Sequence, residues 1–434
     1  MKIEKKLWII LFAFGIFAIC FSGWIFRQST AREKLFWDNT IRCETKELKE
    51  GEIKSENIAL PEDFDVPKSI LFKTTHTIAE VWLDGEKIYE YGNEADAPGF
   101  MKTPGSCWHI VDIPGDSSGK NLEIRIIPVY EGYYGNEVSL VYGTRGDCIL
   151  KILTDSLGIP VISCGILFAA VICILLYCGA ARRKRSDKTE AKIEIFLNLG
   201  FFSLLVAVWT LVQCGFLQFL IPDGRTLYFV EYFSLFLFPV PFNFLLYDIC
   251  KSRYHKGALI FSILYLTNMA VDVLLQWTGI IDMSRLLSVI HVIMVANVVY
   301  TVVIILYEAG KKENDVAQKF RYPMCVVMGF GMAEMIFYYL RRFEQISILL
   351  SMGTMLFIIM LIWIQVSQYY DQYIQKQKVI YLQKIANMDM LTEAMNRNAY
   401  EDMVKYLDEG EIKLRTTGVV VFDLDNLKVI NDNF

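Results

Sequence analysis

Long apolar runs constrain this chain more than any other feature. Of its 434 residues 54% are hydrophobic, whereas soluble domains have roughly 45–50%. A bilayer core about 30 Å thick requires about 20 consecutive apolar residues in a helix. We therefore predict seven membrane-spanning helices between residues 157 and 364. They are Leu157–Cys178, Ile193–Cys214, Thr226–Ile249, Gly257–Trp277, Leu286–Tyr307, Tyr322–Leu340 and Ile346–Trp363.

The charges in the loops predict how these helices are oriented. Lys and Arg are concentrated in the first, third and fifth loops, as in Arg182–Arg185. Cytoplasmic loops carry such an excess of positive charge. An earlier apolar run, Leu7–Phe26, follows several lysines, so residues 1–26 are interpreted as a signal anchor, with a cleaved signal peptide as the alternative. The prediction is a membrane protein with both chain ends in the cytoplasm and residues 27–153 outside.

Residues 27–153 have the pattern of short strands. Runs rich in Val, Ile, Tyr and Trp are separated by Gly, Pro, Asp and Asn, and Asp84-Gly85 is a typical hairpin turn. The spacing is typical of an all-β antiparallel sandwich. The predicted strands are Ser69–Thr74, Ala79–Leu83, Lys87–Tyr91, Trp108–Ile113, Leu122–Val129, Val138–Tyr142 and Cys148–Leu153. The stretch 76–91 resembles the jelly-roll ectodomains found in front of bacterial seven-helix receptors, modules that are similar to carbohydrate-binding sandwiches.

Three groups of residues in this exported domain are candidates for binding or cross-linking. Aromatic side chains could stack on a sugar, or could instead fill the core. His76 and His109 could share a metal, or could be ordinary hydrogen-bonded histidines. Cys43, Cys107 and Cys148 allow one disulfide in an oxidising compartment, with Cys43–Cys148 as the candidate pair. The aromatic candidates are Trp82, Trp108, Tyr130, Tyr133 and Tyr134.

Several ionisable residues lie inside the predicted spans: Glu231, Asp272, His291 and Glu334. Such residues are costly at membrane depth and are by default hypotheses of function. We single out Glu334 and Asp272 as candidates for an intramembrane switch, with a helix–helix hydrogen bond as the alternative. Residues 365–388 contain no Gly or Pro and predict a signalling helix that continues the last span and pairs in a parallel homodimer.

Two motifs follow that helix, DMLTEAMNR at 389–397 and DLDNLKVIND at 423–432. In this order, with a helix-length segment between them, they resemble the start of the diguanylate cyclase family, the GGDEF domains. Glu393 and Leu427 depart from the family pattern, at a glycine and at an aromatic position. The resemblance covers 389–434 only and lacks the GHxxGD, RxxD and GGDEF elements, so the domain is expected to be truncated and inactive as it stands.

The resemblance also implies roles for the matched residues. The cyclases condense two GTP molecules into cyclic di-GMP with Mg²⁺. Asp423 and the carbonyl of Leu424 would bind the metal after a strand at Val419–Phe422. The nucleotide would contact the amides of Asn426 and Leu427 and the side chain of Asn431. The family pattern gives a structural role to Asp389, Thr392, Asn396 and Arg397.

With both resemblances, the expected protein is therefore a multi-domain sensor of the bacterial plasma membrane. It combines an extracytoplasmic sandwich, a seven-helix bundle (157–364), the signalling helix and the start of a cytoplasmic α/β domain resembling nucleotide cyclases. Its ligand would be a carbohydrate or small metabolite from outside, and no surface suggests nucleic-acid binding. Two alternatives remain open: a non-enzymatic receptor with a degenerate output domain, and a transporter with an exported accessory domain.

Overall fold

The computed structural model divides the chain into two compact units, one up to Leu361 and one from Ile362. Each unit is described by itself. The signal-anchor prediction, for residues 1–26, lies outside the described residues. The described residues are 40–42, 54–60, 66–93, 98–130, 139–156, 158–184, 194–311, 313–340, 347–389, 392, 394–409, 418, 420–422, 425, 427–428 and 432.

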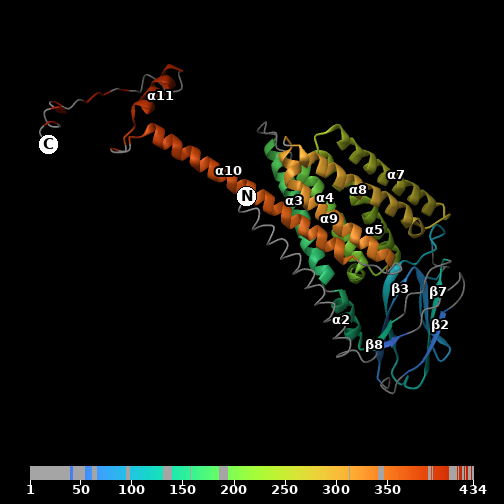
Figure 1. The fold of residues 1–434 in the computed structure, drawn as a ribbon. Coiled ribbons are helices and arrows are strands. Elements are labelled where there is room, and N and C mark those ends of the chain that lie inside the picture. The colour runs from blue at the N-terminus through green and yellow to red at the C-terminus, as the bar shows by residue number, and fades with distance from the viewer. Residues whose placement is uncertain are drawn as a thin grey trace. The chain divides into compact units, whose positions relative to one another are not determined.

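Two four-stranded antiparallel sheets lie at one end of the first unit (Figure 1). One has the order β1 (Thr40–Arg42), β8 (Ser139–Gly143), β3 (Lys68–Thr75), β6 (Ser106–Ile113). The other has the order β2 (Lys54–Ala59), β7 (Asn121–Pro128), β4 (Thr77–Leu83), β5 (Glu86–Tyr91).

The two sheets share one hydrophobic core. Phe72 and Val111 from the first sheet pack with Val81, Leu122 and Ile124 from the second. In β7 every second side chain is buried, which is the period expected of a strand with one face on a core. The six predicted strands from Ser69 to Tyr142 are confirmed, while β1 and β2 were not predicted.

The seventh predicted strand, Cys148–Leu153, is wrong because this segment is helical. It belongs to α2 (Arg145–Ser156). Thr144 and Asp147 form reciprocal bonds, Asp147 N–H to Thr144 Oγ1 at 3.2 Å and Thr144 N–H to Asp147 Oδ2 at 2.9 Å, which is a capping box that starts a helix. Cys148 and Ile152, one turn apart, then pack on Leu71 and Val141 of the sheet.

Long apolar helices follow the sheets among the described residues of the first unit. They are α3 (Gly158–Lys184), α4 (Glu194–Gln213), α5 (Gly224–Leu237), α6 (Pro239–Ile249), α7 (Lys256–Trp277), α8 (Leu287–Gly310) and α9 (Asp315–Leu340). The third predicted span is divided at Pro239, as its prolines indicate. Among the described residues six helical segments are long and apolar enough to cross a membrane, and Ile348–Ile364 is a shorter apolar stretch.

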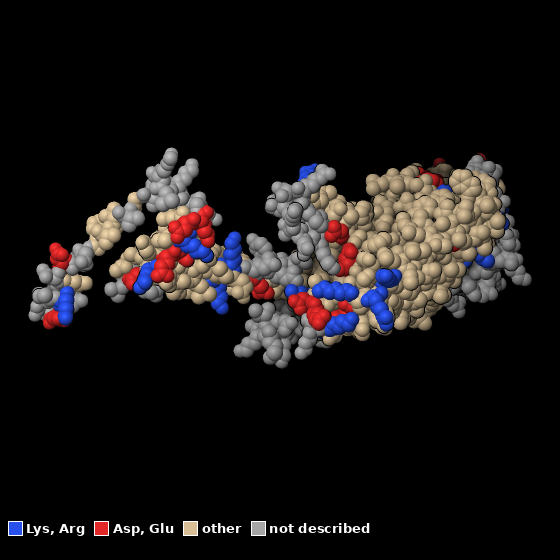
Figure 2. Space-filling view, turned by 90° about the horizontal axis from the view of Figure 1, so that it is seen from above, with Lys and Arg blue, Asp and Glu red and all other residues tan. Residues whose placement is uncertain are grey.

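The outer surface of these helices is apolar. Phe168, Leu175, Leu264, Val292 and Val303 are exposed, on helices α3, α7 and α8. Figure 2 shows a broad tan surface over the helical part, with Lys, Arg, Asp and Glu gathered mainly at one end. Lipid is the solvent that suits such a surface, and the chain is a multi-pass membrane protein.

The sheets are joined to the ends of the helices by polar contacts that are buried or part-buried. Gln218, in the short helix η3 (Phe216–Phe219), accepts from Trp108 N–H at 2.8 Å and donates to Trp108 O at 2.6 Å. Asp282 accepts from Thr103 N–H at 3.2 Å, and Gln276 donates to Phe100 O at 2.7 Å. Gln276 also donates to Asp282 Oδ1 at 2.6 Å, so these bonds hold the sandwich on the bundle at two places.

The last long helix, α10 (Ile348–Asn387), is continuous, as predicted for residues 365–388. In the second unit it is followed by α11 (Arg397–Asp408), which confirms the predicted helix at Tyr400–Leu407. The predicted strand at Val419–Phe422 is not formed by its described residues. Val420, Val421 and Phe422 are exposed and pair with no described strand, and a strand needs a partner for its backbone hydrogen bonds.

Candidate functional site

A cavity of about 340 Å³ lies among helices α4 to α9, under the corner between β3 and β4. Thr75 and His76 of the sandwich form part of its wall, and Leu350 adds the start of α10. Cavities of roughly 300–1,000 Å³ between packed helices are typical of small-molecule sites. The cavity is thus lined by the β-sandwich, by the long apolar helices and by the start of α10.

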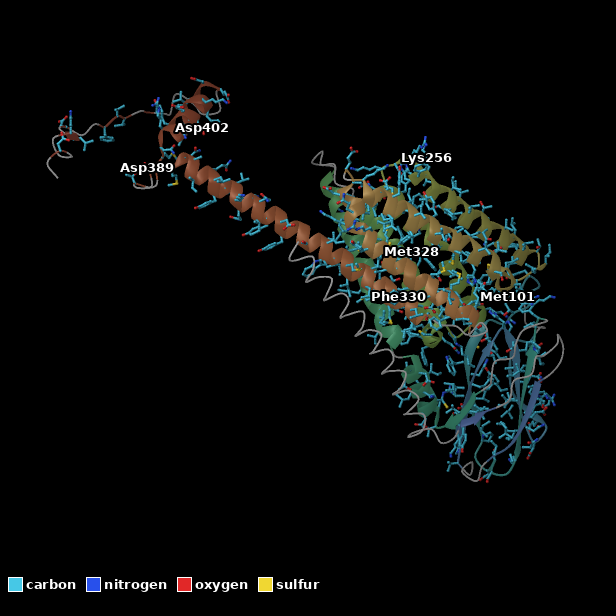
Figure 3. All side chains as sticks on the ribbon, in the orientation of Figure 1. Met101, Lys256, Met328, Phe330, Asp389 and Asp402 are labelled. Carbon is cyan, nitrogen blue, oxygen red and sulfur yellow. The ribbon has the colours of Figure 1, made fainter. Side chains whose placement is uncertain are left out.

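Aromatic rings supply most of the apolar wall. The ring of Phe202 lies 5.1 Å from Phe242 and 6.1 Å from Phe357 in tilted or edge-on contact, which fixes the inner side. Met328 on α9 also lines the cavity, and its place among the helices can be followed in Figure 3. The further rings are Trp209, Tyr232, Phe238, Tyr265, Tyr338 and Tyr339.

Three of the four ionisable residues singled out inside the spans meet at this cavity. Glu231, His291 and Glu334 line it, from α5, α8 and α9. Asp272 does not line it; its carboxylate accepts from Asn268 Nδ2 at 2.7 Å on the same helix. Of the two switch candidates, the structure therefore places only Glu334 at the cavity, and the role of either as a switch stays a prediction.

Glu334 connects the cavity to α10. Its Oε2 accepts from the N–H of Leu350 at 2.9 Å, in the first turn of that helix. Helix N-termini expose unpaired N–H groups and favour a negative charge. The other carboxylate oxygen, Oε1, is buried and has no hydrogen-bond partner among the described residues.

Glu231 lies near the sandwich. Its Oε1 accepts from Gln213 Nε2 at 2.7 Å. Lys73 of β3 is also close enough to interact with it: burial lowers the pKa of Lys73, and attraction to the Glu231 carboxylate opposes that effect. The pair brings one charge of each sign to the contact between sandwich and helices.

His76 occupies the single position between β3 and β4 with φ at +53°, in the left-handed region. Its N–H donates to Gly105 O at 3.0 Å, and its Nδ1 lies 2.9 Å from Thr103 Oγ1. Its ring meets that of Tyr228 on α5 edge-on at 5.7 Å. This strained residue therefore joins the sandwich corner to the cavity wall.

Of the two alternatives for His76 and His109, the structure has the hydrogen-bonded histidines. His109 lies 2.7 Å from Thr74 Oγ1 and 3.0 Å from Tyr89 OH, and so uses different partners from His76. Within the described part of the chain no group of three or more His, Cys, Asp and Glu side chains is arranged to hold a metal. Cys107 and Cys148 are free thiols, so the Cys43–Cys148 bridge is not formed, and Cys43 itself lies outside the described residues.

Because His76 and His109 are buried, we expect the free energy of unfolding to depend on pH. Burial lowers the pKa of His76 to about 4 and that of His109 to about 3. An unfolded histidine has a pKa near 6.5, so below that pH the unfolded chain takes up a proton that the buried residue does not. The free energy of unfolding therefore falls by about 1.4 kcal/mol per histidine for each pH unit between 6.5 and 4. Melting of the purified protein at pH 7.5 and 5.5 should show a smaller loss in H109Q than in the parent; equal losses would contradict the assignment.

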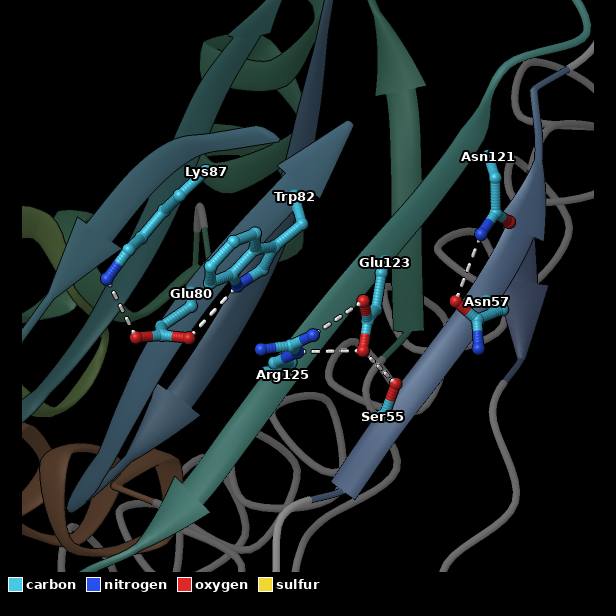
Figure 4. Close-up of polar contacts among 8 residues, drawn as sticks. All are labelled: Ser55, Asn57, Glu80, Trp82, Lys87, Asn121, Glu123 and Arg125. Atoms are coloured by element: carbon cyan, nitrogen blue, oxygen red, sulfur yellow. Dashed lines mark hydrogen bonds and ion pairs between the residues drawn. The ribbon is translucent and has the colours of Figure 1, made fainter. Parts of the chain in front are cut away.

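The aromatic sugar-binding candidates have other contacts. The Trp108 ring centre lies 5.7 Å from Lys73 Nζ, and Tyr130 is buried with the Arg285 guanidinium 5.5 Å from its ring centre. Trp82 lies on the outer face of its sheet, under Arg125 at 4.4 Å and within a network of ion pairs drawn in Figure 4. Tyr133 and Tyr134 lie outside the described residues. The core alternative is wrong for Trp82, whereas Trp108 is half-buried and packs against the cluster of Leu71 and Val141 with Cys148 and Ile152.

The residues of the first C-terminal motif form the turn between α10 and α11. Asp389 Oδ1 accepts from the N–H and the hydroxyl of Thr392, both at 2.9 Å. Asn396 caps α11 through Ala399 N–H and donates to Ala386 O at 2.7 Å. Arg397 is exposed and pairs with Glu401 at 3.0 Å.

The second motif falls mostly outside the described residues. That is so for Asp423, Leu424, Asn426 and Asn431, to which the resemblance gives the Mg²⁺ and nucleotide contacts. Leu427 is described, and its side chain is exposed. The metal and nucleotide roles therefore stay predictions.

Sequence reasoning missed the uncharged polar part of the cavity. The cavity is also lined by Trp209, Gln213 and Asn297, which lie in apolar runs where only ionisable residues were taken as candidates. The amide side chains of Gln213 and Asn297 inside such runs are the sequence signal that could have located this part of the cavity. Comparison with protein-family models, with curated proteins and with solved structures found no match to this chain.

Proposed function

We propose that this protein is a membrane sensor that controls synthesis of cyclic di-GMP through a diguanylate cyclase output beginning at Asp389. One observation carries the sensing half of the proposal. The Glu334 carboxylate faces a built cavity and also accepts from Leu350 in the first turn of α10. A ligand that binds the Glu334 carboxylate would weaken its hydrogen bond to Leu350 and so change the position of α10. That helix continues without a break to Asn387, just before the Asp389 turn.

The resemblance of the two C-terminal motifs supports the output half. In this proposal a homodimer brings two GTP molecules together in the cytoplasm. Asp423 and the Leu424 carbonyl would bind Mg²⁺, which stabilises phosphate charge. Asn426, Leu427 and Asn431 would contact the nucleotide. The proposal includes seven spans in a bacterial plasma membrane, with Ile348–Ile364 as the last, the sandwich outside and the output inside.

A register test examines α10 as the transmitting element. We would join residues 1–388 to a complete diguanylate cyclase domain and measure cyclic di-GMP in cells. An insertion of seven residues after Lys376 rotates the following helix by about 700°, which is close to two full turns. An insertion of two residues at the same place rotates it by about 200°. We expect the first insertion to keep output within about twofold and the second to change it more than tenfold. Equal output from both would contradict transmission by helix orientation.

A further inference from the structure

The cavity wall contains buried polar atoms with no partner. Five residues that line it each bury such an atom within the described part of the chain. A buried polar atom without a partner costs roughly 1–3 kcal/mol. The five atoms are Oε1 of Gln213, Oδ1 of Asn297, Oε1 of Glu334, Nε1 of Trp209 and Oγ of Ser284.

These atoms are mostly acceptors. The amide oxygens of Gln213 and Asn297 accept only, and the Glu334 oxygen accepts when the carboxylate is ionised. Trp209 Nε1 can only donate, and Ser284 can do either. An occupant that satisfies the wall must therefore bring more donors than acceptors, which is unlike a sugar, a carboxylic acid or a phosphate.

The charges at the cavity favour a cation. Glu231, Glu334 and Arg285 are the charged residues of its wall. Glu231 is bonded to Gln213 and attracted by Lys73, and Arg285 lies against the Tyr130 ring of the sandwich. Glu334 is 6% exposed, and no ion pair joins it to any described Lys, Arg or His. When ionised, a buried carboxylate in this state is stabilised by a positive partner.

The apolar wall suits the rest of such a ligand. Aromatic faces attract ammonium groups, by roughly 0.5–2 kcal/mol for each well-placed ring. The rings of Tyr232, Phe242 and Tyr338 line the same cavity as Glu334. Arg285 lies against the Tyr130 ring, and of the unpaired wall atoms only Trp209 Nε1 and Ser284 Oγ could donate to an anion.

We propose that this cavity binds a small organic amine with an aromatic or aliphatic body, its ammonium group held by Glu334. The unpaired amide oxygens of Gln213 and Asn297 then accept from further donors on that body. This inference rests on the proposed role of the cavity as the sensing site and names the chemical class of its ligand. Binding itself requires no output domain.

Three probes that share an indole ring and a two-carbon arm test the charge rule. Tryptamine carries an ammonium group, tryptophol a hydroxyl and indole-3-propionate a carboxylate. Titration calorimetry on the full chain in lipid nanodiscs should show tryptamine binding at least tenfold more tightly than tryptophol, with no heat from the propionate. Phenethylamine and hexylamine extend the amine series to smaller and non-aromatic bodies. Failure of all three amines to bind, or equal affinity for the three indoles, would overturn the proposal.

A pair of variants assigns the binding to Glu334. E334Q should weaken tryptamine at least tenfold, and E334D, which keeps the charge, should fall between E334Q and the parent. The matched control is D272N, because Asp272 is a buried carboxylate of another helix that does not line the cavity. Unchanged binding in E334Q would contradict the assignment.

The outcomes separate the two proposals. If E334Q does not fold, the probe ranking on the parent chain still decides the charge rule. If the parent chain shows no preference for amines but the output of the cyclase fusion still depends on the register of α10, this inference is wrong and the proposed function stands. If the chain binds amines but the output does not depend on the register, the proposed function is wrong and this inference stands.

Discussion

Replacing Gly105 by alanine should detach the sandwich from the helices. Gly105 has φ at +85°, and a Cβ there would collide with the backbone carbonyl of Gly224 at the start of α5. A left-handed non-glycine residue costs about 1–2 kcal/mol, and a forced overlap in a packed interface costs about 1–3 kcal/mol more. We therefore expect G105A to lose about 3 kcal/mol of stability at this contact.

Gly85 provides a matched control for that variant. Its φ is +83°, and a Cβ there meets no atom within 4 Å. G85A thus has the same backbone strain without the collision. Hydrogen exchange should speed up more than tenfold in G105A at the Thr103 and Trp108 amides, which bond to Asp282 and Gln218 across the contact. If G85A accelerated these amides equally, the contact with Gly224 would carry no weight.

This contact also shows where prediction from sequence stops. Runs rich in Val, Ile, Tyr and Trp between turn residues are a local signal, and this signal located β3 to β8 within one or two residues. The same signal failed at Cys148–Leu153, where a capping box and a sheet surface for Cys148 and Ile152 favoured a helix. The approach of Gly105 to Gly224 joins residues far apart in the chain, and no local pattern specifies it.

The candidate site was predictable only in part. Glu334 was identified because an ionisable group inside an apolar run is unusual in itself. Its meeting with Gln213 and Asn297 depends on which faces of α4, α8 and α9 turn toward one another. Packing of side chains such as Phe202 and Phe357 sets those faces, and hydropathy alone does not contain that information.

Filling the cavity from α9 should imitate a bound ligand. Gly331 lines the cavity, and a Cβ on it would lie 3.6 Å from Leu350 Cδ1, an ordinary contact at the start of α10. A phenylalanine at 331 is therefore expected to occupy space beside Leu350 and to shift α10. Gly329, two residues earlier on the same helix, is exposed, and a Cβ there meets no atom within 4 Å. G329F adds the same ring outside the cavity.

The most direct test of whether the cavity controls output is to measure cyclic di-GMP in cells that express the cyclase fusion with each of these variants. At equal membrane levels, G331F should change output at least fivefold from the parent fusion, and G329F should stay within twofold. Equal output from G331F, G329F and the parent would contradict control of α10 by the cavity.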